Sequence, residues 1–294
     1  MLRFHPPGFI DRTLETSLGQ LVYYTTEQPA PSPSPAMVFL HSLGGGSSAY
    51  EWSRVYPAFA AEYPIFAPDL IGWGASAHPV REYQVEDYLT LMQEFLQQVT
   101  SVPAIVWASS LTAGLVIRLA IQRPDLFQTL ILVSPSGYGD FGSDYRRGLS
   151  AQLAGIPGVD RLLYAVGANN ELAIRNFLQQ FLFAQPDRIS DELVAAYLAS
   201  AQQPNAEYAA LASLKGNLCF DLALYMGQLQ VPTVLLWGER AWFSRPETGE
   251  RLASLNPKVV KAFLKIPDAG VLAHLEVPAI VIGLIRGQLS QPGA

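Results

Sequence analysis

The sequence predicts an α/β protein: a mostly parallel sheet of about eight strands, with helices on both faces and a helical segment inserted between two strands. Short apolar runs alternate along the chain with longer segments in which apolar residues recur every three or four positions, which is the pattern of strands and amphipathic helices. Between residues 138 and 228 the strand-like runs disappear. Alternating strands and helices favour a parallel sheet that is covered on both faces.

The chain opens with an expected hairpin. Residues 10–16 and 20–26 read as strands, and the Ser-Leu-Gly sequence at 17–19 reads as the turn between them. Residues 28–35 are rich in proline, serine and alanine. We therefore expect an exposed connector there, and not a domain boundary.

The alternating part of the chain follows this connector. Further strands are expected at residues 37–40, 65–67, 104–107, 130–133, 233–237 and 259–266. Further helices are expected from about residue 49 and at residues 85–99, 111–122, 246–255 and 277–289. Helix 85–99 shows the pattern, because Val85, Leu89 and Met92 fall on one face. Pro124 marks the end of helix 111–122.

The strand-free segment sets the expected domain organisation. A core is predicted from residues 1–137 and 229–294, and residues 138–228, which are rich in aromatic side chains, are predicted to form a helical cap inserted in it. Folds of this kind bind ligands at the carboxyl ends of their strands. The cap is therefore expected to cover that edge of the sheet.

Composition excludes several classes of protein. Of the 294 residues, 50% are hydrophobic and 15% are charged, so the chain is not disordered. A net charge of −6 argues against a nucleic-acid partner. The single cysteine, Cys219, excludes a disulfide framework and a cysteine-rich metal site, and no metal or cofactor is expected. No apolar run has the length of a membrane span or a signal peptide, so a cytoplasmic protein is expected.

The strand, turn and helix at residues 104–122 carry the first chemical motif. The turn reads Ala-Ser-Ser-Leu-Thr at 108–112. It resembles the nucleophile elbow of the α/β-hydrolase family, G-x-S-x-G. In this resemblance Ser110 takes the nucleophile position, while Ala108 and Thr112 stand where the family has glycines.

Four other segments resemble motifs of the same family, in the same order along the chain. They are the oxyanion loop at 41–46, a tight structural turn at 68–76, the strand leading to the catalytic acid at 231–239, and the loop before the last helix at 267–278. The resemblance covers the chain from about residue 8 to residue 289. It implies an α/β-hydrolase fold, and His41 is expected to support the oxyanion loop.

The resemblance also implies the site residues, and the chain departs from the family at two of them. The backbone N–H groups of Leu43 and Leu111 are expected to form the oxyanion hole. The acid position holds Ala241, the base position holds Val271, and His274 matches a second, non-catalytic histidine of the family. A serine without a base is a poor nucleophile near neutral pH.

Three functions stay open on the sequence alone. In the first, a protein with little or no hydrolase activity binds a small apolar molecule, with Phe177, Phe181 and Tyr197 as candidate pocket walls, or binds a protein partner. In the second, an esterase-like or lipase-like serine hydrolase cleaves a hydrophobic carboxylic ester with His274 as a relocated base, although one helical turn displaces that side chain by about 5 Å. In the third, an enzyme uses the pocket and oxyanion hole for a non-hydrolytic reaction.

Overall fold

The computed structural model describes residues 5–28, 34–143, 156, 164, 169–242 and 244–290. Its strands are β1 (Phe9–Thr16), β2 (Gly19–Thr26), β3 (Met37–Leu40), β4 (Ile65–Pro68), β5 (Ala104–Ser109), β6 (Phe127–Val133), β7 (Thr233–Gly238) and β8 (Val260–Ile266). Its helices are α1 (Val85–Val99), α2 (Ser110–Gln122), α5 (Glu171–Phe177), α6 (Asp191–Ala201), α7 (Ala206–Lys215), α8 (Ala223–Met226), α9 (Pro246–Ser254), α10 (Ala273–Glu276) and α11 (Pro278–Leu289).

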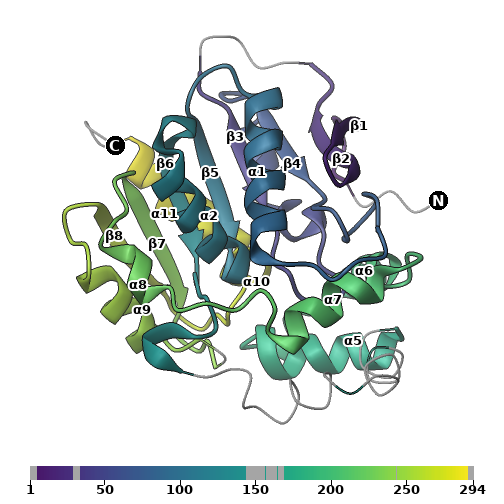
Figure 1. The fold of residues 1–294 in the computed structure, drawn as a ribbon. Helices are drawn as coiled ribbons and strands as arrows, with labels where there is room; N and C mark the ends of the chain where they lie inside the picture. Colours follow the sequence, from purple (N-terminus) through teal and green to yellow (C-terminus); the bar gives the residue numbers. More distant parts are fainter. Residues whose placement is uncertain are drawn as a thin grey trace.

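The strands form one eight-stranded sheet in the order β1-β2-β4-β3-β5-β6-β7-β8 (Figure 1). Pairs from β4 through β3 to β8 are parallel. The hairpin of β1 and β2 joins the edge in antiparallel fashion. The mostly parallel sheet of eight strands that the sequence predicts is therefore confirmed. Of the expected connector at 28–35, residues 29–33 lie outside the described part of the chain.

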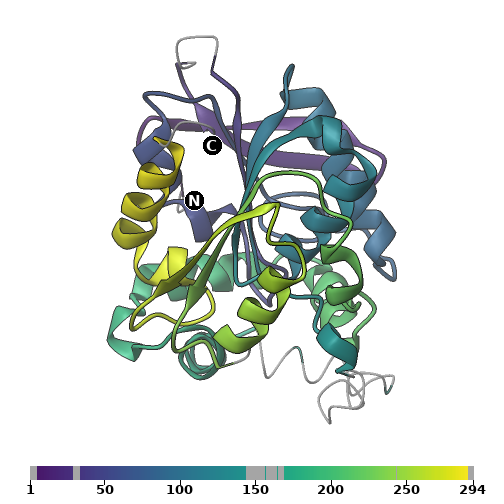
Figure 2. The same cartoon turned by 90° about the vertical axis from the view of Figure 1, so that its left-hand side faces the viewer.

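Helices cover both faces of the sheet, as Figure 2 shows with the sheet seen nearly edge-on. On one face α1 and α2 bury a core that includes Leu89, Phe95 and Leu115. On the other face α11 packs with Val281 and Ile285 against a second core. The two buried faces explain why the parallel strands read as continuous apolar runs.

The segment from residue 49 differs from its predicted helix. It forms two short 3₁₀ turns, Ala49–Trp52 and Tyr56–Phe59. Pro57 lies in the second turn and has no backbone N–H to donate, which interrupts a continuous α-helix. The turns still bury large aromatic side chains, since Trp52 is 0% exposed.

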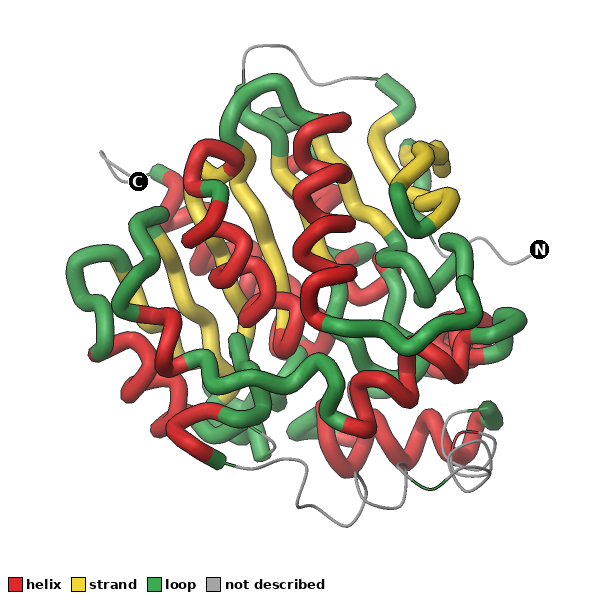
Figure 3. Tube along the Cα trace, in the orientation of Figure 1, coloured by secondary structure: helices red, strands yellow, loops and turns green. Residues whose placement is uncertain are grey.

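The described part of the segment between β6 and β7, called the insertion below, lies at the carboxyl ends of the strands (Figures 1 and 3). A side chain at Gly270, in the loop after β8, would approach the Leu182 carbonyl to 2.2 Å. The insertion therefore packs directly on that loop. Its two ends meet where Tyr138 and Phe220 form a parallel bridge. The domain boundaries at residues 138 and 228 stay a prediction.

Candidate active site

Ser110 lies at the sharp turn between β5 and α2. Its φ is 54°, in the left-handed region that non-glycine residues rarely adopt. A strained serine at a strand-to-helix turn is the geometry of a nucleophile elbow. The structure allows the close packing that this turn needs at Gly114, where a Cβ atom would lie 2.6 Å from the Ser136 carbonyl.

Thr112, which replaces a family glycine, is accommodated in this turn. Its side chain is fully buried. The Thr112 hydroxyl donates a hydrogen bond of 2.7 Å to the carbonyl of His41. The substitution therefore joins the elbow to the oxyanion loop, because a buried hydroxyl needs such a partner.

The Ser110 hydroxyl is paired with a phenol. Ser110 Oγ lies 2.9 Å from Tyr138 Oη. Tyr138 itself has a φ of 59°, and its N–H donates to Ser136 Oγ at 3.0 Å. A phenol hydroxyl is a far weaker base than an imidazole near neutral pH. This contact therefore positions the serine without activating it.

The two positions where the sequence predicts that the acid and the base are replaced carry apolar, buried side chains. Ala241 is 3% exposed and Val271 is 2% exposed. The two loops that hold them touch, since a Cβ atom at Gly238 would lie 2.0 Å from the Gly270 carbonyl. The loops after β7 and β8 are therefore in contact, and neither position 241 nor position 271 carries an ionisable side chain.

His274 does not contact Ser110 in this structure. Its ring stacks on Trp52, with centroids 3.7 Å apart, and neither ring nitrogen has a hydrogen-bond partner among the residues that the structure describes. Burial lowers the pKa of His274 to about 3, so the ring is neutral. This placement gives no support to His274 as a relocated base for Ser110.

We expect His274→Phe to weaken the acid sensitivity of the fold. The unfolded state binds more protons than the folded state between the folded pKa of about 3 and the ordinary value of 6.5, so falling pH destabilises the wild type through His274. The variant keeps an aromatic ring for Trp52. The free energy of unfolding of the variant minus that of the wild type should therefore grow by about 1.4 kcal/mol per pH unit as the pH falls through this window.

Urea denaturation of both proteins at several pH values between about 7 and 5 measures this difference. A difference in free energy of unfolding that stays constant across those pH values would contradict the prediction. It would mean that His274 takes up its proton equally in the folded and unfolded states.

His41 supports the oxyanion loop. Its Nδ1–H donates to the Ser42 carbonyl at 2.6 Å, and its Nε2 accepts from the N–H of Leu70 at 2.9 Å. Burial lowers the pKa of His41 to about 4. The neutral ring thus ties the loop after β3 to the loop after β4. Among the described residues, the N–H of Leu43 makes no hydrogen bond, which leaves it available to a ligand oxygen.

A buried carboxylate, Glu51, lies under the same loop. It accepts from the N–H of Ser42 at 2.7 Å, from Ser42 Oγ at 2.8 Å and from Tyr197 Oη at 2.9 Å. Burial raises the pKa of Glu51. Tyr197 is fully buried in this network, and its role as a pocket wall stays a prediction. Its phenol connects the insertion to the oxyanion loop.

A second carboxylate, Glu276, ties the insertion to the loop that holds Val271. Glu276 accepts from the backbone N–H groups of Ala184, Gln185 and Gly270 at 3.0, 2.9 and 2.6 Å. It also pairs with Arg188 at 3.1 Å. The insertion is therefore anchored beside the base position by a buried charge.

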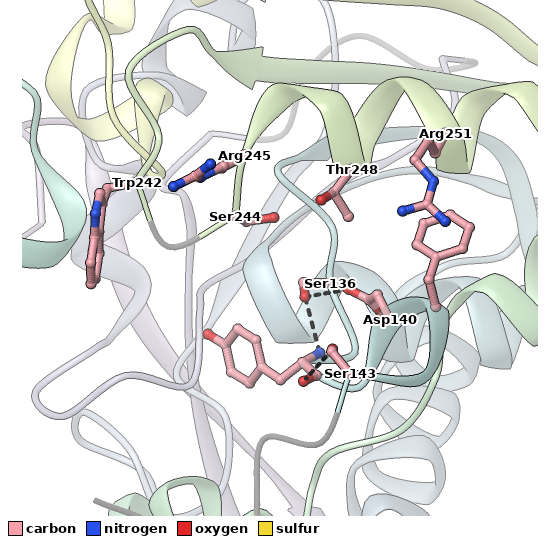
Figure 4. Close-up of a pocket in the computed structure, with 10 residues that line it drawn as sticks. Ser136, Asp140, Ser143, Trp242, Ser244, Arg245, Thr248 and Arg251 are labelled. Carbon is pink, nitrogen blue, oxygen red and sulfur yellow. Dashed lines mark hydrogen bonds between the residues drawn. The ribbon is translucent and has the colours of Figure 1, made fainter. Parts of the chain in front are cut away.

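Tyr138, the hydrogen-bond partner of Ser110, is one of the residues that line a cavity of about 340 Å³. Figure 4 shows the residues of its lining. Its lining combines hydroxyl, charged and aromatic side chains: Ser136, Tyr138, Asp140, Phe141, Ser143, Trp242, Ser244, Arg245, Thr248 and Arg251. Phe177 and Phe181 do not line it. They continue an aromatic row from Trp242, with ring centroids 5.9 Å apart between Trp242 and Phe181 and 5.7 Å between Phe181 and Phe177.

Metal and membrane features are absent from the part of the chain that the structure describes. There, no group of three or more His, Cys, Asp or Glu side chains could hold a metal ion. Nor does any helix within the described ranges combine the length and apolar character needed to cross a bilayer.

A sequence profile of the alpha/beta hydrolase fold matches residues 35–278. This range includes Ser110, the loop at 41–46, Ala241 and Val271. The chain belongs to the α/β-hydrolase fold family.

Relatives within the α/β-hydrolase fold family include esterases and lipases. A pimeloyl-(acyl-carrier protein) methyl ester esterase of Neisseria meningitidis is 24% identical over 251 residues, which cover 85% of this chain and 77% of the esterase. The human (lyso)-N-acylphosphatidylethanolamine lipase is 21% identical and covers 95% of this chain and 86% of its own. An uncharacterised protein of Mycobacterium tuberculosis is 33% identical over 103 residues, and the match spans only 30% of that protein's length.

Solved structures agree on the fold. Carboxylesterase CesB (YbfK) from Bacillus subtilis superposes with a TM-score of 0.75 at 18% identity, over 98% of this chain and 93% of its own. At such low identity the similarity establishes the α/β-hydrolase fold and nothing finer.

Sequence reasoning missed the side chains that touch the site from other elements. Tyr138 gave no signal, because its contact with Ser110 depends on how the loop after β6 folds back. Glu51 did give a signal, because a single acid among the apolar and aromatic residues Ala49, Tyr50 and Trp52 is unusual in a buried turn. Asp268 and Glu276 are the acidic residues on either side of Val271. Glu276 is the more buried of the two, at 6% exposure.

Proposed function

We propose that this protein is an α/β-hydrolase-fold receptor with a degenerate triad, which binds an apolar molecule bearing a carbonyl oxygen and hydrolyses it little or not at all. One observation carries the proposal. Ser110 Oγ is hydrogen-bonded to Tyr138 Oη, while the base and acid positions hold the buried apolar side chains of Val271 and Ala241. Without a base to accept its proton, the serine hydroxyl is not an effective nucleophile.

The same residues favour binding. When Tyr138 Oη donates to Ser110 Oγ, the Ser110 hydroxyl can donate to a ligand oxygen. The N–H of Leu43 is free of other partners among the described residues, and the N–H of Leu111 opens α2, where the first turn has no partner within the helix. These donors suit a carbonyl oxygen, and the neighbouring cavity of about 340 Å³ has the size of a small-molecule site. It favours a small ligand over a protein partner.

Labelling with a fluorophosphonate probe tests the proposal directly, because this probe reacts with activated serines. We expect wild-type protein to label no faster than Ser110→Ala, under conditions that fully label an active serine esterase. Turnover of short-chain p-nitrophenyl esters should likewise not differ between the two proteins. Labelling or turnover that is lost in Ser110→Ala would contradict the proposal.

The alternative is a serine hydrolase that cleaves a carboxylic ester. The strained Ser110 and the esterases and lipases among the relatives favour it. It requires a base that reaches Ser110 in a state other than the one described. Ser110-dependent turnover that is also lost in His274→Phe would establish this alternative and identify the base.

A further inference from the structure

One wall of the cavity beside Tyr138 carries positive charge without a matching acid. Ser244 and Arg245 immediately precede α9, and Thr248 lies in its first turn. Arg251 lies in its last turn, and Figure 4 shows all four on the same side of the cavity. Both arginines are exposed. Neither guanidinium forms an ion pair with any residue that the structure describes. Arg251 lies over the ring of Phe141, 3.7 Å from its centroid. That contact uses the face of the guanidinium and leaves its N–H edge for other partners.

The hydroxyl groups of this wall are fixed in position but can still form further hydrogen bonds. Ser244 is only 7% exposed, and its carbonyl accepts from Trp237 Nε1 at 2.8 Å. Within the described part of the chain, Ser244 Oγ has no hydrogen-bond partner although it lines the cavity. This hydroxyl is therefore available to a ligand or a water molecule that enters the cavity. The N-terminus of α9 adds a positive dipole end at the same place.

The acids on the opposite wall are already occupied. Asp140 accepts from Ser136 Oγ at 2.6 Å and from the backbone N–H groups of Gly137 and Leu222, each at 3.0 Å. Asp221, just behind it, accepts from the N–H groups of Phe141 and Gly142 at 2.9 and 3.0 Å. These hydrogen bonds hold both carboxylates in the loop after β6 and its surroundings, and within the described part of the chain neither carboxylate forms an ion pair with Arg245 or Arg251.

We infer that the wall formed by Ser244, Arg245 and α9 binds the anionic group, a carboxylate or a phosphate, of the apolar ligand. This inference rests on the proposed function and adds a charge to the ligand. Arg245, Arg251, Ser244 and Thr248 supply guanidinium and hydroxyl donors of the type that binds such oxygens. The aromatic row of Trp242, Phe181 and Phe177 then offers a path for the apolar part, with Phe177 lying against Gly44 of the oxyanion loop.

Calorimetric titration with three probes of one chain length tests this inference. Octanoate and octyl phosphate carry the two anions, and methyl octanoate carries a neutral carbonyl. The variants are Arg245→Gln, Arg251→Gln and Ser244→Ala, with Arg12→Gln, an exposed arginine on β1, as the matched control. Circular dichroism of each variant checks that it is folded.

We expect both anionic probes to bind more tightly than methyl octanoate. Each arginine variant should weaken the anionic probes about tenfold, because a hydrogen bond to a charged group is lost, and leave methyl octanoate unchanged. Arg12→Gln should change nothing. The tighter of the two anions identifies whether the natural group is a carboxylate or a phosphate.

The outcomes separate the two proposals. If all three probes bind equally and the arginine variants have no effect, the anion site is wrong while the binding function stands. If methyl octanoate is cleaved in a Ser110-dependent way, the proposed function is wrong, and the arginine variants still decide the anion site. If no probe binds, both proposals fail.

Discussion

Glu276→Ala is expected to lower the free energy of unfolding by about 3–5 kcal/mol, a large part of the ~5–15 kcal/mol of a typical protein. The carboxylate accepts from the N–H groups of Ala184, Gln185 and Gly270, and it pairs with Arg188. Glu276 is only 6% exposed, so water cannot fully replace it. Its removal leaves three amides and one guanidinium without their acceptor.

Urea denaturation measures this loss of stability, and two further variants serve as comparisons. Glu276→Gln keeps the size of the side chain but puts an NH₂ group where a carboxylate oxygen accepts, so it should also destabilise strongly. Glu247→Ala removes an exposed acid on α9 and should leave stability unchanged. A Glu276→Ala protein as stable as the wild type would show that the anchor between the insertion and the loop after β8 contributes nothing.

The second large effect is a gain of esterase activity when the triad is rebuilt. Ala241→Asp with Val271→His supplies an acid and a base at the family positions, and Tyr138→Phe releases the Ser110 hydroxyl from its phenol partner. The two loops already meet where Gly238 approaches Gly270, so the new side chains start close together. We expect kcat/KM for short-chain p-nitrophenyl esters to rise about a hundredfold, the low end for a positioned base.

Controls for the rebuilt triad follow from how its members cooperate. The acid acts by orienting and stabilising the histidine, so the combined variant should exceed either Ala241→Asp or Val271→His alone. Adding Ser110→Ala should abolish the gain. Activity that survives Ser110→Ala would place the chemistry elsewhere and contradict the role assigned to the elbow.

The fold was predictable because its main signals are local. Apolar runs such as the one at Thr233–Gly238 are buried on both faces of the sheet, so they read as strands without any tertiary information. The amphipathic pattern of Val85–Val99 likewise fixed the length of α1. The helix expected from residue 49 was wrong, because Pro57 has no backbone N–H and the segment forms two short 3₁₀ turns instead.

The site was predictable only in part, for a physical reason. Ser110, Ala241 and Val271 follow from motif positions along the chain, since each lies at the end of a strand or in a loop of fixed order. Tyr138 and Glu51 act through contacts between segments that are distant in sequence or turned back on themselves. Such contacts depend on loop conformation, which a single sequence does not specify.

The backbone around Ser110 has a thermodynamic consequence for any ligand. Ser110, Ser134, Tyr138 and Phe141 all have φ between 46° and 59°, a region that costs non-glycine residues on the order of 1 kcal/mol each. The surrounding packing must therefore hold both the elbow and the loop after β6 in one conformation before a ligand arrives. A ligand that binds there loses its own freedom but orders little protein, so the entropy of binding is less unfavourable than at a flexible loop.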